Sequence, residues 1–161
     1  MNRVVVAVLG FLLSTALAAQ EITESRAWTE RFPVSGPEPR LKISNIWGTV
    51  RVRPGPAGQI TIAVDERRSA PDQERFDRSL RLLKTDIGAG VDSVEIIVGE
   101  PTRNWRRTDP CRGCRVDYQF DVTVPEGTRL ELGTVLDGAI DVSGVAGTVS
   151  ASNVNGPIKV Y

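Results

Sequence analysis

The chain has 161 residues, of which 40% are apolar and 25% charged, and its 20 Lys and Arg residues balance 20 Asp and Glu residues. This composition is typical of a globular domain rather than a disordered chain, and the zero net charge argues against a generic binder of nucleic acid or another polyanion. Histidine is absent, which excludes a Ser-His-Asp triad, a Cys-His pair, an HExxH zinc site and any imidazole metal ligand.

The first 18 residues have the three parts of a secretory signal peptide. Arg3 supplies a positive charge, an apolar run extends over residues 4–13, and residues 16–18 are a small-x-small cleavage signal. The apolar run is shorter than the roughly 20 residues that span a bilayer, which disfavours a membrane anchor. We therefore expect cleavage after Ala18 and export to the periplasm, cell surface or exterior, without a membrane span and without a nucleic-acid partner.

The remainder of the chain is dominated by patterns that alternate between apolar and polar residues. A polar tether is expected over residues 19–31, ahead of a domain over 32–161. Alternation predicts strands over 32–34, 41–44, 46–52, 60–64 and 94–98, and again through most of 116–161. The domain is therefore expected to be mainly β.

One helix is expected over residues 71–84. Pro71 suits the first helical position, with the cap at residues 69–70, and acidic residues precede basic ones along the segment. A single apolar stripe, typical of a helix packed on a sheet, consists of Phe76, Leu80 and Leu83.

A polar loop is expected over residues 99–116, and it contains both cysteines, Cys111 and Cys114. Haem attachment needs a His after the second Cys, where Arg115 stands, and a zinc site needs about four ligands. No metal or cofactor is therefore expected. The favoured interpretation is a structural disulfide in an oxidising compartment; a redox-active dithiol, free thiols or an intermolecular metal site are the alternatives.

The same loop also concentrates arginine around a tryptophan. Guanidinium planes beside an exposed Trp suit an anionic glycan, a lipid headgroup or a protein partner, whereas the alternative is a solvated loop with its Trp packed inward. The residues of this candidate binding loop are Arg103, Trp105, Arg106, Arg107, Arg112 and Arg115.

The C-terminal third contains a nine-residue repeat of the form Φ-x-Gly-x-Φ-x-Φ, in which Φ is apolar. Copies occupy 136–142, 145–151 and 154–160, and a further copy lies upstream at 46–52. Units this short cannot bury their own apolar side chains, so we expect them to stack, two units to an eighteen-residue coil. A tight corner or a close backbone approach is expected at the repeat glycines, Gly48, Gly138, Gly147 and Gly156.

Stacking of this kind predicts a right-handed parallel β-helix or β-solenoid-like domain with one packed helix. The alternative is an antiparallel meander or sandwich, with hairpins at the joints 143–144 and 152–153. The last unit stops directly after a strand, without a polar cap. Because an uncovered coil exposes core positions and main-chain groups, we expect either that the domain is truncated there or that residues 154–161 self-associate or pair with a partner.

Two pairs of aspartates have matching strand parity and are candidate catalytic groups. They are Asp117 with Asp121, and Asp137 with Asp141. Paired carboxylates can cleave glycosidic bonds or bind calcium. However, Asp before Gly is ordinary turn chemistry, and outward Asp on a strand favours solubility. No catalytic residue is therefore predicted, and a polysaccharide-active β-helix enzyme is kept as an alternative.

Three segments follow one another in a recognisable order. Residues 32–52 form alternating strands that end in Trp47-Gly48, residues 118–127 read aromatic-x-aromatic-x-Val-x-Val-Pro-x-Gly, and glycine repeats run to Tyr161. In this order they resemble the opening, the central signature and the C-terminal solenoid of the putative-adhesin domain family, also known as domain of unknown function 4097. The chain departs from that family in its small number of repeats and in its Cys-bearing loop.

The resemblance implies a β-solenoid-like domain on an exported or envelope protein, without catalytic residues. We therefore expect a non-enzymatic, adhesin-like interaction module of the cell envelope or surface, whose partner is an envelope or surface protein or a glycan. An envelope-stress sensing or scaffold domain, the polysaccharide-active enzyme and a thiol-redox accessory protein are the alternatives.

Overall fold

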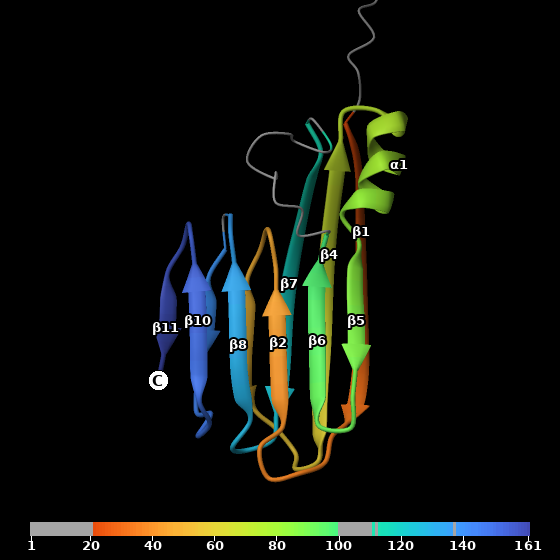
Figure 1. The fold of residues 1–161 in the computed structure, drawn as a ribbon. Helices are drawn as coiled ribbons and strands as arrows, with labels where there is room; N and C mark the ends of the chain where they lie inside the picture. The colour runs from red at the N-terminus through yellow and green to blue at the C-terminus, as the bar shows by residue number, and fades with distance from the viewer. Residues whose placement is uncertain (1–20, 100–110, 112, 137) are drawn as a thin grey trace, which may run out of the picture.

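The computed structural model describes residues 21–99, 111, 113–136 and 138–161, which form two mixed β-sheets and one helix (Figure 1). The six-stranded sheet has the order β1-β4-β7-β3-β9-β11, and the five-stranded sheet has the order β10-β8-β2-β6-β5. The prediction of a mainly β protein with one helix is confirmed. The elements are β1 (Ile22–Pro33), β2 (Arg40–Ser44), β3 (Val50–Pro54), β4 (Gln59–Ala70), α1 (Gln73–Leu82), β5 (Thr85–Ala89), β6 (Ser93–Val98), β7 (Arg115–Val124), β8 (Arg129–Thr134), β9 (Ile140–Val142), β10 (Val149–Asn153) and β11 (Ile158–Val160).

In the C-terminal third, parallel pairing joins strands that lie about two nine-residue repeat units apart in the sequence. β8 pairs with β10, placing Leu130 opposite Val149, and β9 pairs with β11, placing Ile140 opposite Ile158. On their other sides β8 and β9 pair in parallel with β2 and β3, which in turn pair with β6 and β7. Since β9, β10 and β11 alternate between the two sheets, neither predicted hairpin joint closes a hairpin, and the meander alternative is wrong there.

Antiparallel strands complete both sheets at the opposite end from β10 and β11. β1 pairs with β4 along its whole length, β4 pairs with β7, and β5 pairs with β6. The prediction of a polar tether over 19–31 is therefore wrong from Ile22 onward. The polar side chains of this segment do not prevent strand formation, because the main-chain groups bond to β4 whatever the side chains are.

The core lies between the two sheets and is built from every second residue of the strands. Phe120, Val50 and Ile140 follow one another across the six-stranded sheet, and all are fully buried. Leu41 and Leu130 are neighbours across the five-stranded sheet and are also fully buried. Burying each such side chain contributes about 1.5–3 kcal/mol, so the strands stabilise one another mainly through this interior.

Helix α1 lies inside the predicted range 71–84 but begins later than expected. Asp72, not a residue at 69–70, is the N-cap, and its carboxylate accepts a hydrogen bond from the main-chain N–H of Arg75 at 2.8 Å. The predicted cap is wrong because β4 still includes residues 69–70. Within the predicted stripe, Leu80 is half-buried, whereas Phe76 and Leu83 are buried.

A buried arginine connects this helical segment to the six-stranded sheet. Arg68, on β4, is 3% exposed. Its Nε donates to the Glu66 carboxylate at 2.8 Å and its Nη1 to the Ser79 hydroxyl at 3.0 Å. Its Nη2 donates to the main-chain oxygen of Leu83 at 2.8 Å and to the Tyr118 hydroxyl at 3.2 Å. The guanidinium therefore joins side chains of β4 and β7 to both ends of the last helical turn.

Sequence analysis missed this network because the predicted strand ended at residue 64. The following run, 65–69, is mostly charged, a composition that does not predict a strand. Its parity nevertheless places Glu66 and Arg68 on the same inner face as Val64. The sequence does contain a signal for this network: Glu66 and Arg68 have opposite charges and continue the inward-facing positions of the apolar run that ends at Val64.

The Tyr118 hydroxyl makes the stability of the fold depend on pH. Burial raises the pKa of Tyr118 above its ordinary value of about 10; the nearby Glu66 raises this pKa further, whereas Arg68 opposes the increase. The folded protein therefore holds this proton more tightly than the unfolded chain does. Its contribution to stability is complete below pH of about 10 and is lost as pH rises through the raised pKa.

We expect the free energy of unfolding to fall more steeply above about pH 10 in the wild type than in Tyr118→Phe, because phenylalanine has no proton to lose. Urea denaturation at about pH 8, 9, 10 and 11 measures both slopes. The comparison of slopes removes the constant loss of the hydrogen bond from the hydroxyl to Leu83. Identical slopes would show that Tyr118 does not contribute to the alkaline limit.

Candidate functional site

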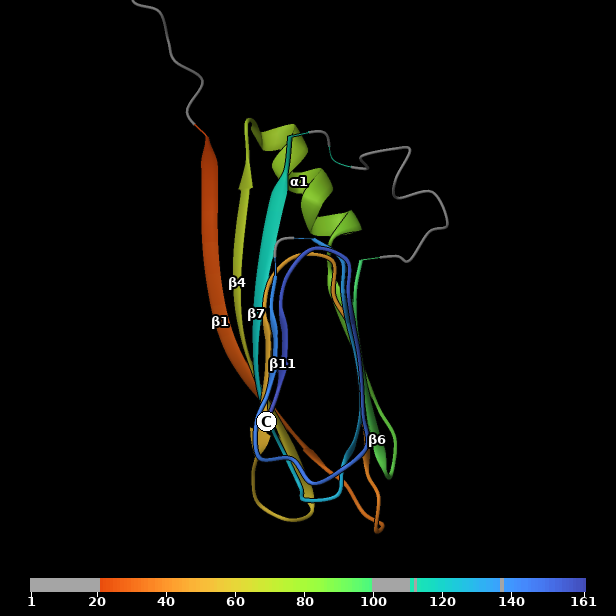
Figure 2. The ribbon, with the colours of Figure 1, turned by 90° about the vertical axis from the view of Figure 1, so that its left-hand side faces the viewer.

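The last strands of both sheets are uncovered at one end of the molecule, which faces the viewer in Figure 2. β10 is the outermost strand of the five-stranded sheet, and β11 is the outermost strand of the six-stranded sheet. Four apolar side chains are exposed there: Val154 by 59%, Ile158 by 42%, Val160 by 53% and Tyr161 by 75%. We refer to these four residues as the open end.

Two of these side chains stand at positions that are interior elsewhere in the sheet. Ile158 lies opposite Ile140 on β9, and Ile140 lies opposite Val50 on β3. Ile140 and Val50 are 0% exposed, because a strand lies on both sides of each. The row that ends at Val160 has the same pattern. The open end is therefore a section through the core, not a set of scattered surface residues.

Three of the repeat glycines form one column beside this surface. A Cβ built on Gly156 would overlap the main-chain oxygen of Gly138, and one on Gly138 would overlap that of Gly48. A Cβ on Gly48 would overlap the main-chain oxygen of Tyr118. Main chain therefore lies directly against main chain at this corner, and only glycine leaves the required space. Gly147 lies outside this column, at a different corner.

Charges alternate in sign along one row of the outer face of the six-stranded sheet. Arg51 on β3 lies 3.4 Å from Asp121 on β7 (Nη1 to Oδ2) and is in register with Asp141 on β9. Asp141 is in register with Lys159 on β11. We call Asp121, Arg51, Asp141 and Lys159 the charge row. Lys159 is its last member, because no strand of the described residues pairs with the outer edge of β11.

The aspartates considered for catalysis lie beside basic residues. Asp121 and Asp141 belong to the charge row, and Asp117 lies 3.9 Å from Arg115 (Oδ2 to Nη2). Asp137 lies outside the described residues. Within the described ranges, no group of three or more acidic or cysteine side chains could hold a metal ion. The described aspartates therefore have the environment of surface ion pairs rather than of convergent catalytic acids.

Most of the candidate binding loop lies outside the described residues. Arg115 is described, and it is an exposed residue at the start of β7. The function of the loop therefore stays a prediction. The members outside the described residues are Arg103, Trp105, Arg106, Arg107 and Arg112.

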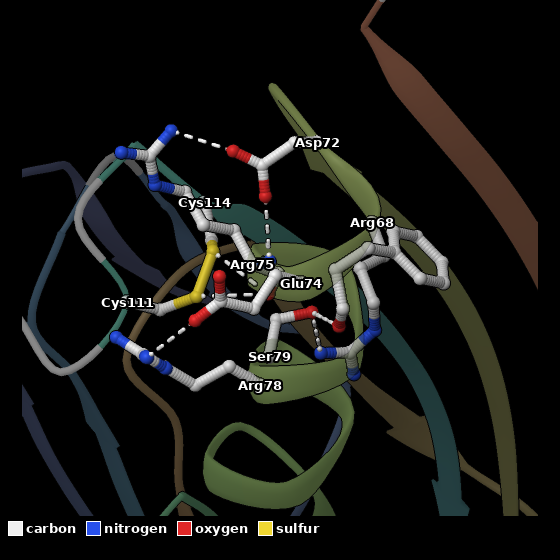
Figure 3. Close-up of a disulfide and its surroundings, with 9 residues drawn as sticks. Arg68, Asp72, Glu74, Arg75, Arg78, Ser79, Cys111 and Cys114 are labelled. Atoms are coloured by element: carbon white, nitrogen blue, oxygen red, sulfur yellow. Dashed lines mark hydrogen bonds and ion pairs between the residues drawn. A yellow bond between two sulfur atoms is a disulfide. The ribbon is translucent and has the colours of Figure 1, made fainter.

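Cys111 and Cys114 form a disulfide, as the sequence predicts. Both sulfur atoms lie 3.2 Å from the main-chain oxygen of Arg75 in α1, and Cys111 is 1% exposed (Figure 3). The main-chain N–H of Cys114 donates to the carbonyl of Cys111 at 2.8 Å. The bridge therefore holds the chain against the helix just before β7 begins, which is a structural role.

Replacing one of these cysteines should destabilise the protein moderately without changing its fold. We expect Cys111→Ser to lose about 2 kcal/mol of stability, because the bridge closes a very short loop, and to lower the melting temperature by roughly 4–8 °C. Circular dichroism measures the melting temperature and the β signal, and the wild type in reductant is the matched control. Complete unfolding of the variant would mean that the disulfide holds the whole fold.

A shallow polar hollow of about 740 Å³ lies on the outer face of β1, β4 and β7. Acidic and basic side chains are interleaved across it, so neither sign of charge converges on one point. This arrangement is typical of a solvated face. The lining residues on this outer face include Asp65, Arg67, Arg115 and Asp117.

Comparison with known proteins gives only distant likenesses in structure. A "putative cell adhesion protein" from Clostridium sporogenes matches with a TM-score of 0.44 at 11% identity, over 85% of this chain and 58% of that protein. A "putative lipid binding protein" from Parabacteroides distasonis matches with a TM-score of 0.34 at 11% identity, over 84% and 52%. A "putative adhesin" from Bacteroides fragilis matches with a TM-score of 0.30 at 9% identity, over 84% and 58%.

The chain thus spans between half and three fifths of the length of these structures. Likenesses this low carry no argument about function. No family model and no curated protein matches the sequence. The resemblance to the putative-adhesin domain family therefore stays a prediction. The helix in the described part of the chain has 10 residues, too few to cross a membrane.

Proposed function

We propose that this protein is an exported, non-enzymatic, adhesin-like interaction module of the cell envelope. The observation that carries the proposal is the open end, where Ile158 and Val160 stand at interior positions of the sheet but are exposed. Covering apolar surface contributes about 25 cal/mol per Å². A partner that lies on this end would therefore bury Ile158 and Val160, as the equivalent side chains of the neighbouring strands are already buried, and the complex would be stabilised. Contiguous apolar surface of this kind marks interaction sites.

The architecture that fits this function is a short right-handed β-solenoid. In it β2 with β3, β8 with β9, and β10 with β11 are stacked coils, and the last two of these coils are offset by about the length of two repeat units. A solenoid needs a cover at each end, because its terminal coils expose core positions. β1, β4 and β5 supply the cover at one end, whereas no described strand covers β10 and β11 at the open end.

Export and the absence of catalysis rest on separate observations. A disulfide forms and persists in oxidising compartments, in agreement with the signal peptide expected over residues 1–18. Asp117 and Asp121 lie in ion pairs with arginine, and Asp141 is in register with Arg51 and Lys159, which suits solubility better than acid–base catalysis.

Adhesion of coated beads tests the proposed function. Beads carrying the exported, disulfide-bonded protein are mixed with envelope fragments from the cells that produce it, and bound fragments are counted by flow cytometry. We expect binding by the wild type and its loss in the double variant Ile158→Lys with Val160→Lys. The matched control is the double variant Val91→Lys with Val135→Lys, which adds the same charge at two other exposed apolar residues. Absence of binding by the wild type, or equal binding by all three proteins, would overturn the proposal.

A further inference from the structure

We infer that this protein forms a symmetric dimer through β1, in which two antiparallel copies of this strand join the six-stranded sheets of two molecules. β1 is the outermost strand of its sheet, at the opposite end from β11 (Figure 2). It is 12 residues long, and no strand of the described residues pairs with its outer edge. An edge of this length presents a row of unpaired N–H and C=O groups, which a second strand satisfies.

The main-chain groups that face outward from β1 belong to its odd-numbered residues. The N–H of Val34 donates to the carbonyl of Gly58 at 2.9 Å, which continues the register of β1 with β4. Because these groups alternate in direction along a strand, even-numbered residues bond to β4 and odd-numbered residues face the open edge. The outward residues from Thr23 to Arg31 have an N–H, whereas Pro33 has none. A second copy must therefore place odd-numbered residues opposite odd-numbered residues.

Three charged side chains on the inner face of β1 restrict which strands can pair with it. Glu24, Arg26 and Glu30 share this face with Trp28, which lies opposite Val64 of β4. Inward charges on an edge strand oppose pairing with most other strands, because a mismatched charge would lose water without gaining a partner. A strand that pairs with β1 must therefore offer opposite charges at the matching positions.

A second copy of β1 offers these charges in the register that is centred on Trp28. Trp28 then lies opposite Trp28 of the second copy, and symmetry places Arg26 of each molecule opposite Glu30 of the other. Glu24 lies opposite Phe32, so no like charges meet anywhere on this face. Nearly the whole length of both strands is paired. The dimer therefore gains two ion pairs and a full ladder of main-chain hydrogen bonds.

Other antiparallel registers of two β1 strands lack this match. A shift of the register in one direction places Glu24 opposite Glu30, and a shift in the other direction places Arg26 opposite Phe32. Opposite charges also meet where Arg26 lies opposite Glu24, but that register joins only residues 22–28. Charge complementarity over the whole strand therefore selects the register centred on Trp28.

The side chains of the free strand are arranged in a way that suits this register. Nε1 of Trp28 donates to Oε1 of Glu30 at 3.1 Å, which holds the carboxylate beside the indole. The Arg26 side chain is 55% exposed and donates to Glu24 through Nε, so its terminal nitrogens are further donors for Glu30 of the second copy. The two Trp28 side chains would occupy a non-hydrogen-bonded pair, where side chains approach most closely and aromatic pairs are favourable.

Sedimentation of the exported, disulfide-bonded protein tests the dimer and its register together. We expect a monomer–dimer equilibrium between roughly 1 μM and 1 mM. Arg26→Glu and Glu30→Arg should each weaken the dimer about tenfold, because symmetry then places two like-charged pairs at the interface. A mixture of the two variants should dimerise more tightly than either variant alone, because each acid meets an arginine again. The matched control is Arg78→Glu, which makes the same charge change at an exposed ion pair of α1 and should leave the dimer unchanged.

Hydrogen exchange of the wild type locates the contact without any substitution. The outward amides of Ala27 and Thr29 should gain protection as the protein concentration rises and the dimer forms. A wild type that stays monomeric at the highest concentration would overturn the inference. So would a mixture of Arg26→Glu and Glu30→Arg that is no tighter than either variant alone. A dimer that Ile158→Lys dissociates, with these two amides unchanged, would place self-association at residues 154–161 and would also overturn it.

Discussion

Gly48→Ala is expected to destabilise the protein by about 3 kcal/mol or more. Two effects act together at this corner. The backbone φ of Gly48 is +109°, a region that residues with a Cβ rarely adopt. In addition, the new methyl group would overlap the main-chain oxygen of Tyr118, which is held in place by β7. Main chain cannot move aside as a flexible side chain can, so the stacked turns must separate.

Urea denaturation followed by circular dichroism measures this loss. Gly88→Ala is the matched control, because a Cβ there has no atom within 4 Å and its φ lies outside the left-handed region. We expect the control to change stability by less than about 1 kcal/mol. A similarly small effect in Gly48→Ala would mean that the corner relaxes and that the glycine column does not set the stacking of the turns.

The corner that contains Gly147 extends the same test. A Cβ on Gly147 would overlap the main-chain oxygen of Thr128, although the φ of Gly147 is not in the left-handed region. We therefore expect Gly147→Val to cost at least about 1 kcal/mol through the steric overlap, without the additional φ strain. No change in this variant would indicate that the nine-residue repeat has no structural meaning at this corner.

Arg68→Ala is expected to destabilise the protein by about 3–5 kcal/mol. Removal of the guanidinium leaves the Glu66 carboxylate, which is 11% exposed, without its charged partner. It also removes the donors to Ser79 and to the main-chain oxygen of Leu83, which connect α1 to β4. An unpaired charge in a low-dielectric interior costs more than the pair contributes when intact.

Chemical denaturation of two further variants separates this effect from loss of a surface ion pair. Arg51→Ala breaks the exposed pair with Asp121, and we expect it to cost less than about 1 kcal/mol. Arg68→Met combined with Glu66→Leu replaces the buried pair with apolar side chains, and we expect it to recover part of the loss. If Arg68→Ala is no more harmful than Arg51→Ala, the buried network is not a major contributor to stability.

The sequence alone determined those features that depend on local patterns. Alternation located most strands, including β6 and the first half of β4, and the stripe of Phe76 and Leu83 located α1. Residue type and spacing were sufficient for these elements, because the apolar residues of a strand or a helix recur in the sequence with the period of that element. The disulfide was predictable for the same reason, because two cysteines separated by two residues have few other partners in a chain without histidine.

Only the tertiary structure decided which strands are neighbours. β1 is a strand because β4 lies beside it, although its own residues predict a polar tether. Arg68 is buried because β4 continues between β1 and β7 and α1 lies across its inner face. The charge row joins residues from β7, β3, β9 and β11, whose order in the sheet is not their order in the chain. Such features depend on contacts between distant segments, and a pattern within one segment does not contain the register of another.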